Sequence, residues 1–293
     1  MTVPTLVERP RSPVLSPGTG RCRVLGVLNV TPDSFSDGGR YLDLDAAITR
    51  GLSLVQDGAD IVDVGGESTR PGAGRVDEAE ELRRVVPVVR ALCDQGVSVS
   101  VDTMRASVAA AALEAGAVIV NDVSGGLADP AMLSLLAESQ APCILMHWRA
   151  QSDVMDLHAS YGAVVDDVRE ELARRVDAAL AAGVDAGNII LDPGLGFAKT
   201  PDQTWSLLAG MPAVQALGFP LLVGASRKRF LAEVVDYGGL DPADPADRDD
   251  ASSAVTVLAA AAGAWGVRVH RPAPSAAAVR VAARLAAADG GLR

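Results

Sequence analysis

Hydrophobic residues along this chain form eight short apolar runs, and each run is followed by a segment in which apolar residues recur with helical spacing. Continuous apolar runs of this length are typical of strands buried on both faces of a sheet. The expected strands are residues 24–28, 60–64, 97–101, 117–120, 143–146, 188–191, 220–223 and 267–269. The main expected helices are residues 44–57, 77–93, 105–115, 130–138, 164–182, 203–217 and 275–288.

The alternation of strands and helices predicts the fold class. Strands joined through helices lie parallel and are connected by right-handed crossovers. Eight such units can close on themselves, and 293 residues suit that arrangement. We therefore predict an α/β protein with a single (β/α)8 TIM barrel over residues 22–293, preceded by a disordered tail at 1–21. An open doubly wound sheet is the alternative, but no G-x-G-x-x-G turn follows the first run.

Polar residues stand at the ends of nearly all the apolar runs. In barrels of this kind the functional site is built at the carboxyl ends of the strands. One polar strand end commonly does no more than begin a turn, but the recurrence predicts a site at this end of the barrel. The residues concerned are Asn29, Asp63, Asp102, Asn121, His147, Asp192, Lys228, Arg268 and His270.

Charge and cysteine content restrict the partners and the compartment. The net charge of −11 argues against a nucleic acid or an anionic membrane as partner. The three cysteines lie far apart without metal-ligand spacing, which fits a reducing compartment, and no run is long enough to span a membrane. We expect a cytoplasmic protein that binds neither nucleic acid nor membrane.

Lysine is scarce in this chain. Of 26 basic residues only Lys199 and Lys228 are lysines, and both follow shortly after an expected strand. Lysine carries a compact ammonium that the arginine fork does not reproduce. The placement indicates that these two positions require an ammonium group.

The strand-end residues suggest two kinds of binding. Asp102, Asn121 and Asp192 could hold the edge of a flat heterocycle that carries an amino group beside a ring N–H, or alternatively a metal ion. Arg268 and His270 are two residues apart on one strand and so point the same way. With Asn29 as an oxygen ligand they would suit a diphosphate with Mg2+, although Arg268 could instead form a structural ion pair at the barrel rim.

Eight segments in this order resemble the dihydropteroate synthase family of bacterial folate biosynthesis, and most closely its actinobacterial members. The resemblance extends from about residue 24 to the end of the chain. The segments are VLGVLNVTPDSFSDGG, DVGGESTRPGA, SVDTMR, VNDVSGG, LMHWR, LDPGLGFAKT, VGASRKRF and GVRVH. The resemblance implies a transferase that condenses (7,8-dihydropterin-6-yl)methyl diphosphate with 4-aminobenzoate, uses Mg2+, forms a homodimer and is inhibited by sulfonamides.

The resemblance also implies roles for particular residues. The implied catalytic residues are Asp33, Lys228, Arg268 and His270, and the implied Mg2+ ligand is Asn29. The pterin would lie among Asp102, Asn121, Asp192 and Lys228, with Met146 and Phe197 as walls. Further substrate contacts would come from Gly224, Ser226 and Val269. The 4-aminobenzoate pocket would be shaped by Phe35, Thr69 and Pro71, on two loops at about 31–40 and 67–75 that close over the site.

Three places depart from the family pattern. Arg229 stands where some members have a serine that contacts the 4-aminobenzoate carboxylate, so we expect that contact from the backbone. Arg271 and Pro272 replace a common acidic continuation, and the segment 151–158 departs from the common form without an assigned role.

A pterin-binding methyltransferase barrel and a non-catalytic paralogue are the alternative functions. The first does not need the Arg268 and His270 pair, and the second predicts broken loops, whereas TPDSFSDGG and STRPG are intact.

Overall fold

The computed structural model describes residues 20–31, 39–67, 76–151, 153–235 and 237–289. Eight parallel strands form one sheet in the order β6-β5-β4-β3-β2-β1-β8-β7. The strands are β1 (Arg23–Asn29), β2 (Ile61–Gly65), β3 (Val99–Asp102), β4 (Ile119–Asp122), β5 (Cys143–Met146), β6 (Ile189–Asp192), β7 (Leu222–Val223) and β8 (Gly266–Val269). A bridge between Leu191 and Leu221 joins β6 to the β7 edge, so the sheet closes and the predicted barrel is confirmed.

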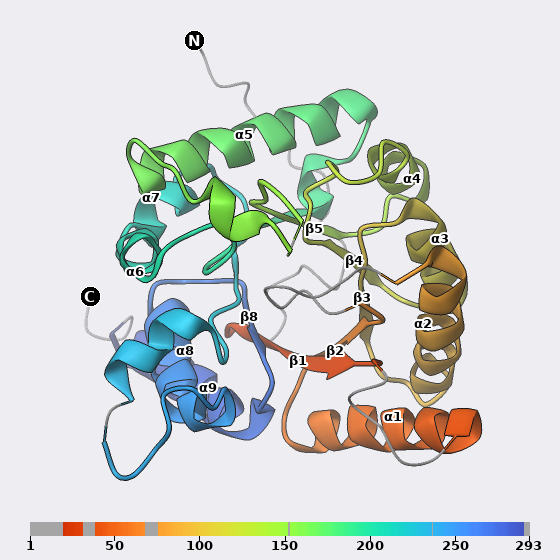
Figure 1. Ribbon diagram of the computed structural model, residues 1–293, viewed down its shortest axis with the longest axis horizontal. Helices are drawn as coiled ribbons and strands as arrows, with labels where there is room; N and C mark the ends of the chain where they lie inside the picture. Colours follow the sequence, from red (N-terminus) through yellow and green to blue (C-terminus); the bar gives the residue numbers. More distant parts are fainter. Residues whose placement is uncertain (1–19, 32–38, 68–75, 152, 236, 290–293) are drawn as a thin grey trace.

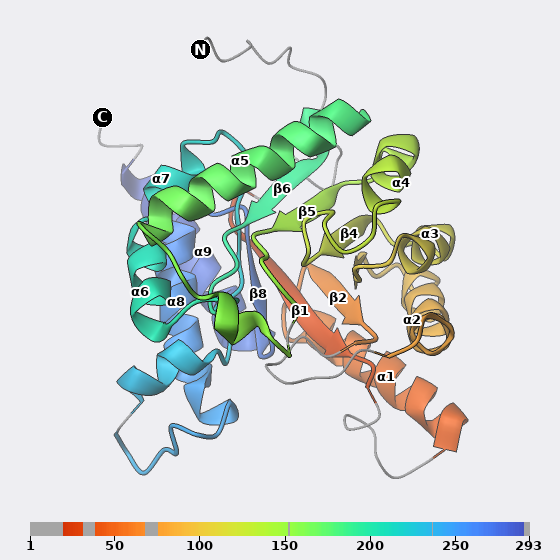
Figure 2. The same cartoon turned by 45° about the horizontal axis from the view of Figure 1, so that its top comes forward.

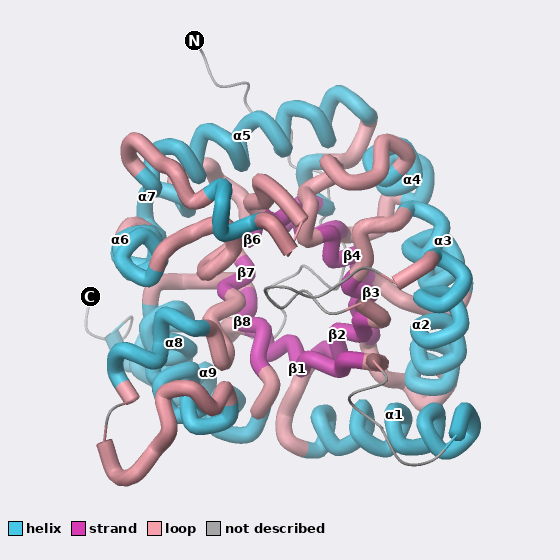
Figure 3. The backbone as a smooth tube through the Cα atoms, viewed as in Figure 1, coloured by secondary structure: helices cyan, strands magenta, loops and turns pink. Residues whose placement is uncertain are grey.

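The helices surround the strands as an outer ring (Figures 1 and 3). They are α1 (Gly39–Gln56), α2 (Glu78–Cys93), α3 (Ala106–Glu114), α4 (Met132–Ser139), α5 (Val164–Ala182), α6 (Pro201–Ala209), α7 (Met211–Gln215), α8 (Asp249–Ala261) and α9 (Pro272–Asp289). Short 3-10 turns include η2 (Met155–His158), η4 (Arg229–Val234) and η5 (Ala246–Arg248). Figure 2 shows α5 lying outside β5 and β6. Within the described residues, none of these helices is both long and apolar enough to cross a membrane.

One residue of the predicted tail is tied to the barrel. Residues 1–19 are outside the described part of the chain. Arg21, which we assigned to the tail, instead makes a two-pronged ion pair with Asp60, with N–O distances of 2.8 and 2.7 Å. The Asp60 carboxylate also accepts a hydrogen bond from the backbone N–H of Val24, so Arg21 is tied to the first strand.

Strand ends are the main difference between the expected and observed elements. We placed the polar residues just beyond the strands, but Asp102, Asn121 and Asp192 are the last or next-to-last residues within β3, β4 and β6. They take part in the ladder, where Asp102 pairs with Asn121 and Asp192 pairs with Met146. Their backbones are therefore held by hydrogen bonds, which fixes the direction of each side chain.

The seventh strand is shorter than predicted. We expected residues 220–223, but only Leu222 and Val223 form the strand. Pro220 has no N–H to donate to a ladder, although its carbonyl accepts a hydrogen bond from the Leu191 N–H at 2.9 Å. The neighbouring bridge at Leu221 completes the closure of the barrel.

Two hydrophobic layers hold the fold together. The larger lies between strands and helices and includes Val62, Val101 and Leu191. The smaller fills the inside of the barrel and consists of Leu25, Ile61, Ile119, Ile144, Ile190 and Leu222. Because side chains on a strand alternate between faces, the residue two positions after each of these also points inward. That next layer contains Val27, Asp63, Asn121, Met146, Asp192 and Gly224. It forms the base of a polar site above the apolar layer inside the barrel.

Candidate active site

A cavity of about 520 Å³ opens above this layer at the carboxyl ends of the strands. It brings together eleven of the residues singled out from the sequence. These are Asn29, Asn121, Met146, Asp192, Phe197, Lys199, Gly224, Ser226, Lys228, Arg268 and His270. Four further predicted residues, Asp33, Phe35, Thr69 and Pro71, lie outside the described part of the chain.

Four predicted residues do not line the cavity: Asp63, Asp102, His147 and Val269. The side chain of Val269 is buried in the core between strands and helices, so only its backbone is available to a ligand. Asp102 is also buried, and it lies behind Arg268, which donates from Nη2 to its Oδ2 at 2.6 Å. Burial raises the pKa of Asp102 to about 7, with a further rise from the Asp63 carboxylate, although Arg268 acts in the opposite direction.

Arg268 forms the structural ion pair that the sequence left open as an alternative. Its Nε donates to Oδ2 of Asp63 at 2.6 Å, in addition to the bond to Asp102. Burial by itself lowers the pKa of Arg268, but the two carboxylates outweigh it and raise the value. The guanidinium links β8 to β2 and β3 and also faces the cavity. It therefore holds the barrel together at the same place where it can meet an anion.

Asp63 is a site residue whose role the sequence reasoning missed. Its carboxylate is fully buried, and Oδ2 accepts from Arg268 and from Nδ2 of Asn121 at 3.1 Å. The position was visible in the sequence, because Asp63 follows Ile61 by two residues and so had to point into the barrel. The sequence alone did not reveal its partner, Arg268, which lies 205 positions away along the chain.

Asp192 presents a buried carboxylate at the cavity wall. Its Oδ1 accepts a hydrogen bond of 2.7 Å from the N–H of Gly194, which fixes the rotamer. Burial raises the pKa of Asp192, whereas the Lys228 ammonium and the Gly194 N–H oppose that rise. The result is an acceptor held rigidly on a strand.

Lys228 lies next to this carboxylate. Its Nζ donates to the carbonyl oxygen of Leu195 and lies 4.4 Å from the centre of the Phe197 ring. Burial lowers the pKa of Lys228 to about 8, although Asp192 favours the charged form. Lys228 therefore places an amino group, with a pKa close to neutral pH, beside the aromatic ring of Phe197.

His270 and Ser226 form a second polar pair on the wall. Oγ of Ser226 is 3.0 Å from Nδ1 of His270, and it also accepts from the His270 backbone N–H at 3.2 Å. The two contacts fix the orientation of the imidazole relative to β8. Arg268 and His270 both line the cavity, as their spacing on one strand predicted.

The segment 151–158, to which we assigned no role, lies beside the cavity. Met155 and Asp156 from η2 line it, and so does Arg229. Nη2 of Arg229 contacts both carboxylate oxygens of Asp156 at 2.9 Å. This ion pair is more than half exposed, so it joins two loops at the mouth of the cavity without being part of the core.

Comparison with known proteins agrees with this geometry. The sequence pattern of the family described as "Pterin binding enzyme" matches residues 25–270. The dihydropteroate synthase of Mycobacterium leprae is 55% identical over 262 residues, which cover 88% of this chain and 92% of that protein. The chain belongs to the dihydropteroate synthase family.

Solved structures of dihydropteroate synthases share the barrel. The enzyme from Xanthomonas albilineans with 4-aminobenzoic acid superposes with a TM-score of 0.83 at 42% identity, covering 91% of this chain and 94% of that one. The Yersinia pestis enzyme in complex with a sulfonamide drug gives a TM-score of 0.83 at 37% identity, covering 91% and 95%. The chain therefore matches dihydropteroate synthases over nearly the whole barrel.

Proposed function

We propose that this protein catalyses the condensation of (7,8-dihydropterin-6-yl)methyl diphosphate with 4-aminobenzoate, which forms 7,8-dihydropteroate and diphosphate in folate biosynthesis. The observation that carries this proposal is the convergence of two acceptor side chains, two cationic side chains and one imidazole on one cavity. Asp192 and Asn121 line this cavity together with Lys228, Arg268 and His270. Membership in the dihydropteroate synthase family supports the same reaction.

The hydrogen-bond acceptors Asp192 and Asn121 suit the edge of the pterin ring. The Asp192 carboxylate can accept from an amino group and an adjacent ring N–H together, and Asn121 can both donate and accept. Met146 and Phe197 provide apolar surfaces beside them. Asp102 acts through Arg268 in this arrangement, since it does not itself line the cavity.

The cationic side suits the leaving diphosphate. Arg268 and Lys228 are partly buried cations that line the cavity, and groups held in place where negative charge develops stabilise the transition state strongly. The attacking aniline nitrogen is neutral, so the reaction needs no strong base. No Ser–His–Asp or Cys–His arrangement was evident in the sequence, which leaves direct displacement or prior departure of diphosphate.

Mg2+ is proposed as the cofactor, with Asn29 as its protein ligand. Among the described residues no three His, Cys, Asp or Glu side chains gather closely enough to hold a metal ion. A neutral amide oxygen at the end of β1, facing the cavity, fits a Mg2+ that takes most of its ligands from phosphate oxygens and water. When bound, the ion would neutralise charge on the diphosphate.

A homodimer in the cytoplasm is proposed as the working form. The support is a group of exposed apolar side chains on the adjacent helices α8 and α9. Their exposed fractions are 41% for Val257, 61% for Leu258, 56% for Val281 and 66% for Leu285. Exposed apolar groups on neighbouring helices are typical of protein–protein contacts, and a second copy of the chain is the proposed occupant.

Turnover with both substrates tests the reaction. The purified chain with Mg2+ should form 7,8-dihydropteroate only when both substrates are present, and a sulfonamide should compete with 4-aminobenzoate rather than with the pterin diphosphate. Chromatographic detection of the product, with each substrate omitted in turn as the control, measures this. A folded chain that forms no dihydropteroate under these conditions would refute the proposal.

A further inference from the structure

The two lysines of this chain hold the same loop. The loop between β6 and α6, residues 193–200, is here called the β6–α6 loop. Lys228 donates to the carbonyl of Leu195, and Lys199 donates from Nζ to the carbonyls of Gly194 at 2.9 Å and Phe197 at 3.0 Å. Three carbonyls of one loop are thus bound by the only two lysines in the sequence.

The backbone of this loop needs such support. Gly194, Gly196 and Ala198 have φ angles of +66°, +74° and +49°, so every second residue is left-handed. Alanine rarely adopts that conformation, which shows that the surroundings impose it. The loop also lies very close to the end of β5, because a Cβ on Gly194 would stand 2.4 Å from the His147 carbonyl oxygen.

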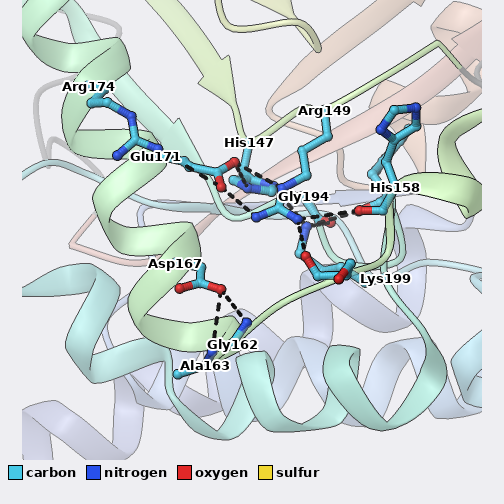
Figure 4. Close-up of polar contacts among 12 residues, drawn as sticks. His147, Arg149, His158, Gly162, Ala163, Asp167, Glu171, Arg174, Gly194 and Lys199 are labelled. Atoms are coloured by element: carbon cyan, nitrogen blue, oxygen red, sulfur yellow. Dashed lines mark hydrogen bonds and ion pairs between the residues drawn. The ribbon is translucent and has the colours of Figure 1, made fainter.

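His147 provides the third hydrogen-bond partner of the Lys199 ammonium group. The distance from Nζ to Nδ1 of His147 is 2.9 Å, and Nε2 of the same ring is 2.8 Å from the Glu171 carboxylate (Figure 4). Nε2 must carry a hydrogen to meet a carboxylate, so in a neutral ring Nδ1 accepts from Lys199. All three donors of the ammonium then have an acceptor. Lys199 and His147 are 4% and 2% exposed, so water can replace few of these bonds.

Glu171 lies on helix α5 and is held by Arg149. Its two carboxylate oxygens accept hydrogen bonds from Nη2 and Nε of Arg149 at 2.5 and 3.1 Å. Burial, with the Lys199 charge, lowers the pKa of His147 to about 4, so the ring is neutral. Burial also lowers the pKa of Lys199 well below its ordinary value, but the three acceptors around Nζ match the three hydrogens of the charged form. The connection runs without a gap from α5, through the end of β5, to the carbonyls of the β6–α6 loop (Figure 4).

The loop adjoins one part of the proposed pterin pocket and carries another. Asp192 precedes it directly and is fixed by the Gly194 N–H, while Phe197 is one of its residues. We propose that Lys199 is a positioning residue, which holds the β6–α6 loop so that the Asp192 carboxylate and the Phe197 ring face the pterin. The identity of the ligand rests on the proposed function, whereas the effect on the loop does not.

Hydrogen–deuterium exchange of the Lys199→Met variant tests this without any substrate. Methionine has a similar length but no donors, so the amides of residues 194–200 should exchange at least tenfold faster than in the parent. Asp60→Asn is the control, because it weakens a partly buried polar contact outside this loop. It should leave exchange in the loop unchanged even if it lowers the melting temperature.

Steady-state kinetics supply the second readout. Lys199→Met should raise KM for the pterin diphosphate at least tenfold and leave KM for 4-aminobenzoate within about twofold. If the parent forms no dihydropteroate, the proposed function fails, and the exchange measurement alone decides the role of Lys199. Unchanged exchange in the loop, or equal losses for both substrates, would overturn the inference.

Two variants of His147 keep the test decisive if Lys199→Met does not fold. Asn places its amide oxygen near the position of Nδ1 and can still accept from Lys199, whereas Gln places its amide near Nε2 and can still meet only Glu171. We expect loop exchange in His147→Asn to stay within about threefold of the parent and that in His147→Gln to rise at least tenfold. The reverse order would show that the loop is held through Glu171 and not through Lys199.

Discussion

Replacement of Asp192 by Asn is expected to weaken binding of the pterin diphosphate by tens to thousands of fold while the protein stays folded. The carboxylate ends β6, is 5% exposed, and is held by the Gly194 N–H at 2.7 Å. Asn has the same size but replaces one acceptor by a donor, so it opposes a donor on the pterin ring. Loss of a buried charge-assisted partner costs about 2–5 kcal/mol, and about 1.4 kcal/mol corresponds to tenfold in affinity.

Calorimetric titration beside a thermal melt measures this effect. Asp185→Asn is a matched control, because Asp185, four residues before β6, accepts from the Gly187 N–H at 2.8 Å in a similar local arrangement. It should leave pterin affinity unchanged. A folded Asp192→Asn variant that binds within about threefold of the parent would mean that Asp192 only begins a turn.

Replacement of Arg268 by Met is expected to cost about 3–5 kcal/mol of folding free energy, because it leaves buried carboxylates without their cation. Asp63 and Asp102 both lose a bond of 2.6 Å, and Asp63 already has one buried oxygen without a partner among the described residues. Diphosphate binding should be lost as well. Denaturant unfolding at several pH values measures the stability.

The pH dependence of this loss has a definite sign. The pKa of Asp102 in the folded protein is about 7, above the ordinary value of 3.8, so the folded state binds more protons between these values. Stability therefore falls as pH rises through this range. Without Arg268 the pKa of Asp102 should rise further, so the fall should extend to higher pH and the loss at pH 8 should exceed the loss at pH 5.

Arg229→Met is the control for Arg268→Met. The Arg229–Asp156 pair has a comparable contact distance but is more than half exposed, and exposed pairs contribute about 0–1 kcal/mol. Equal losses for the two variants would show that the interior pair does not support the barrel.

The sequence predicts the strands well because each is an apolar run buried on both faces. It misplaces their ends, since a run stops at the first polar residue whereas the ladder continues through Asp102, Asn121 and Asp192. It also lengthens the seventh strand, because Pro220 is apolar in the pattern but cannot donate to the ladder. Periodicity reports burial, whereas strand ends depend on backbone hydrogen bonds.

The candidate site is predictable in its location but not in its internal pairing. Polar strand ends identify the correct mouth of the barrel. The pairing of Arg268 with Asp63 requires β8 and β2 to lie on either side of β1, which only closure of the barrel brings about. The role of Lys199 depends on left-handed residues in the β6–α6 loop and on a partner from α5, and neither leaves a pattern in the sequence.

A crystal structure of this chain with 7,8-dihydropteroate tests the central claim most directly. The claim is that the cavity above the apolar layer inside the barrel holds the pterin against Asp192 and Asn121. The reacting carbon would then point toward the cationic side chains. We predict the amino group and adjacent ring nitrogen of the pterin within hydrogen-bond distance of the Asp192 carboxylate, with the ring against Phe197 and the Arg268 guanidinium beyond it. A pterin ring bound elsewhere, or turned with its amino edge away from Asp192, would contradict the account.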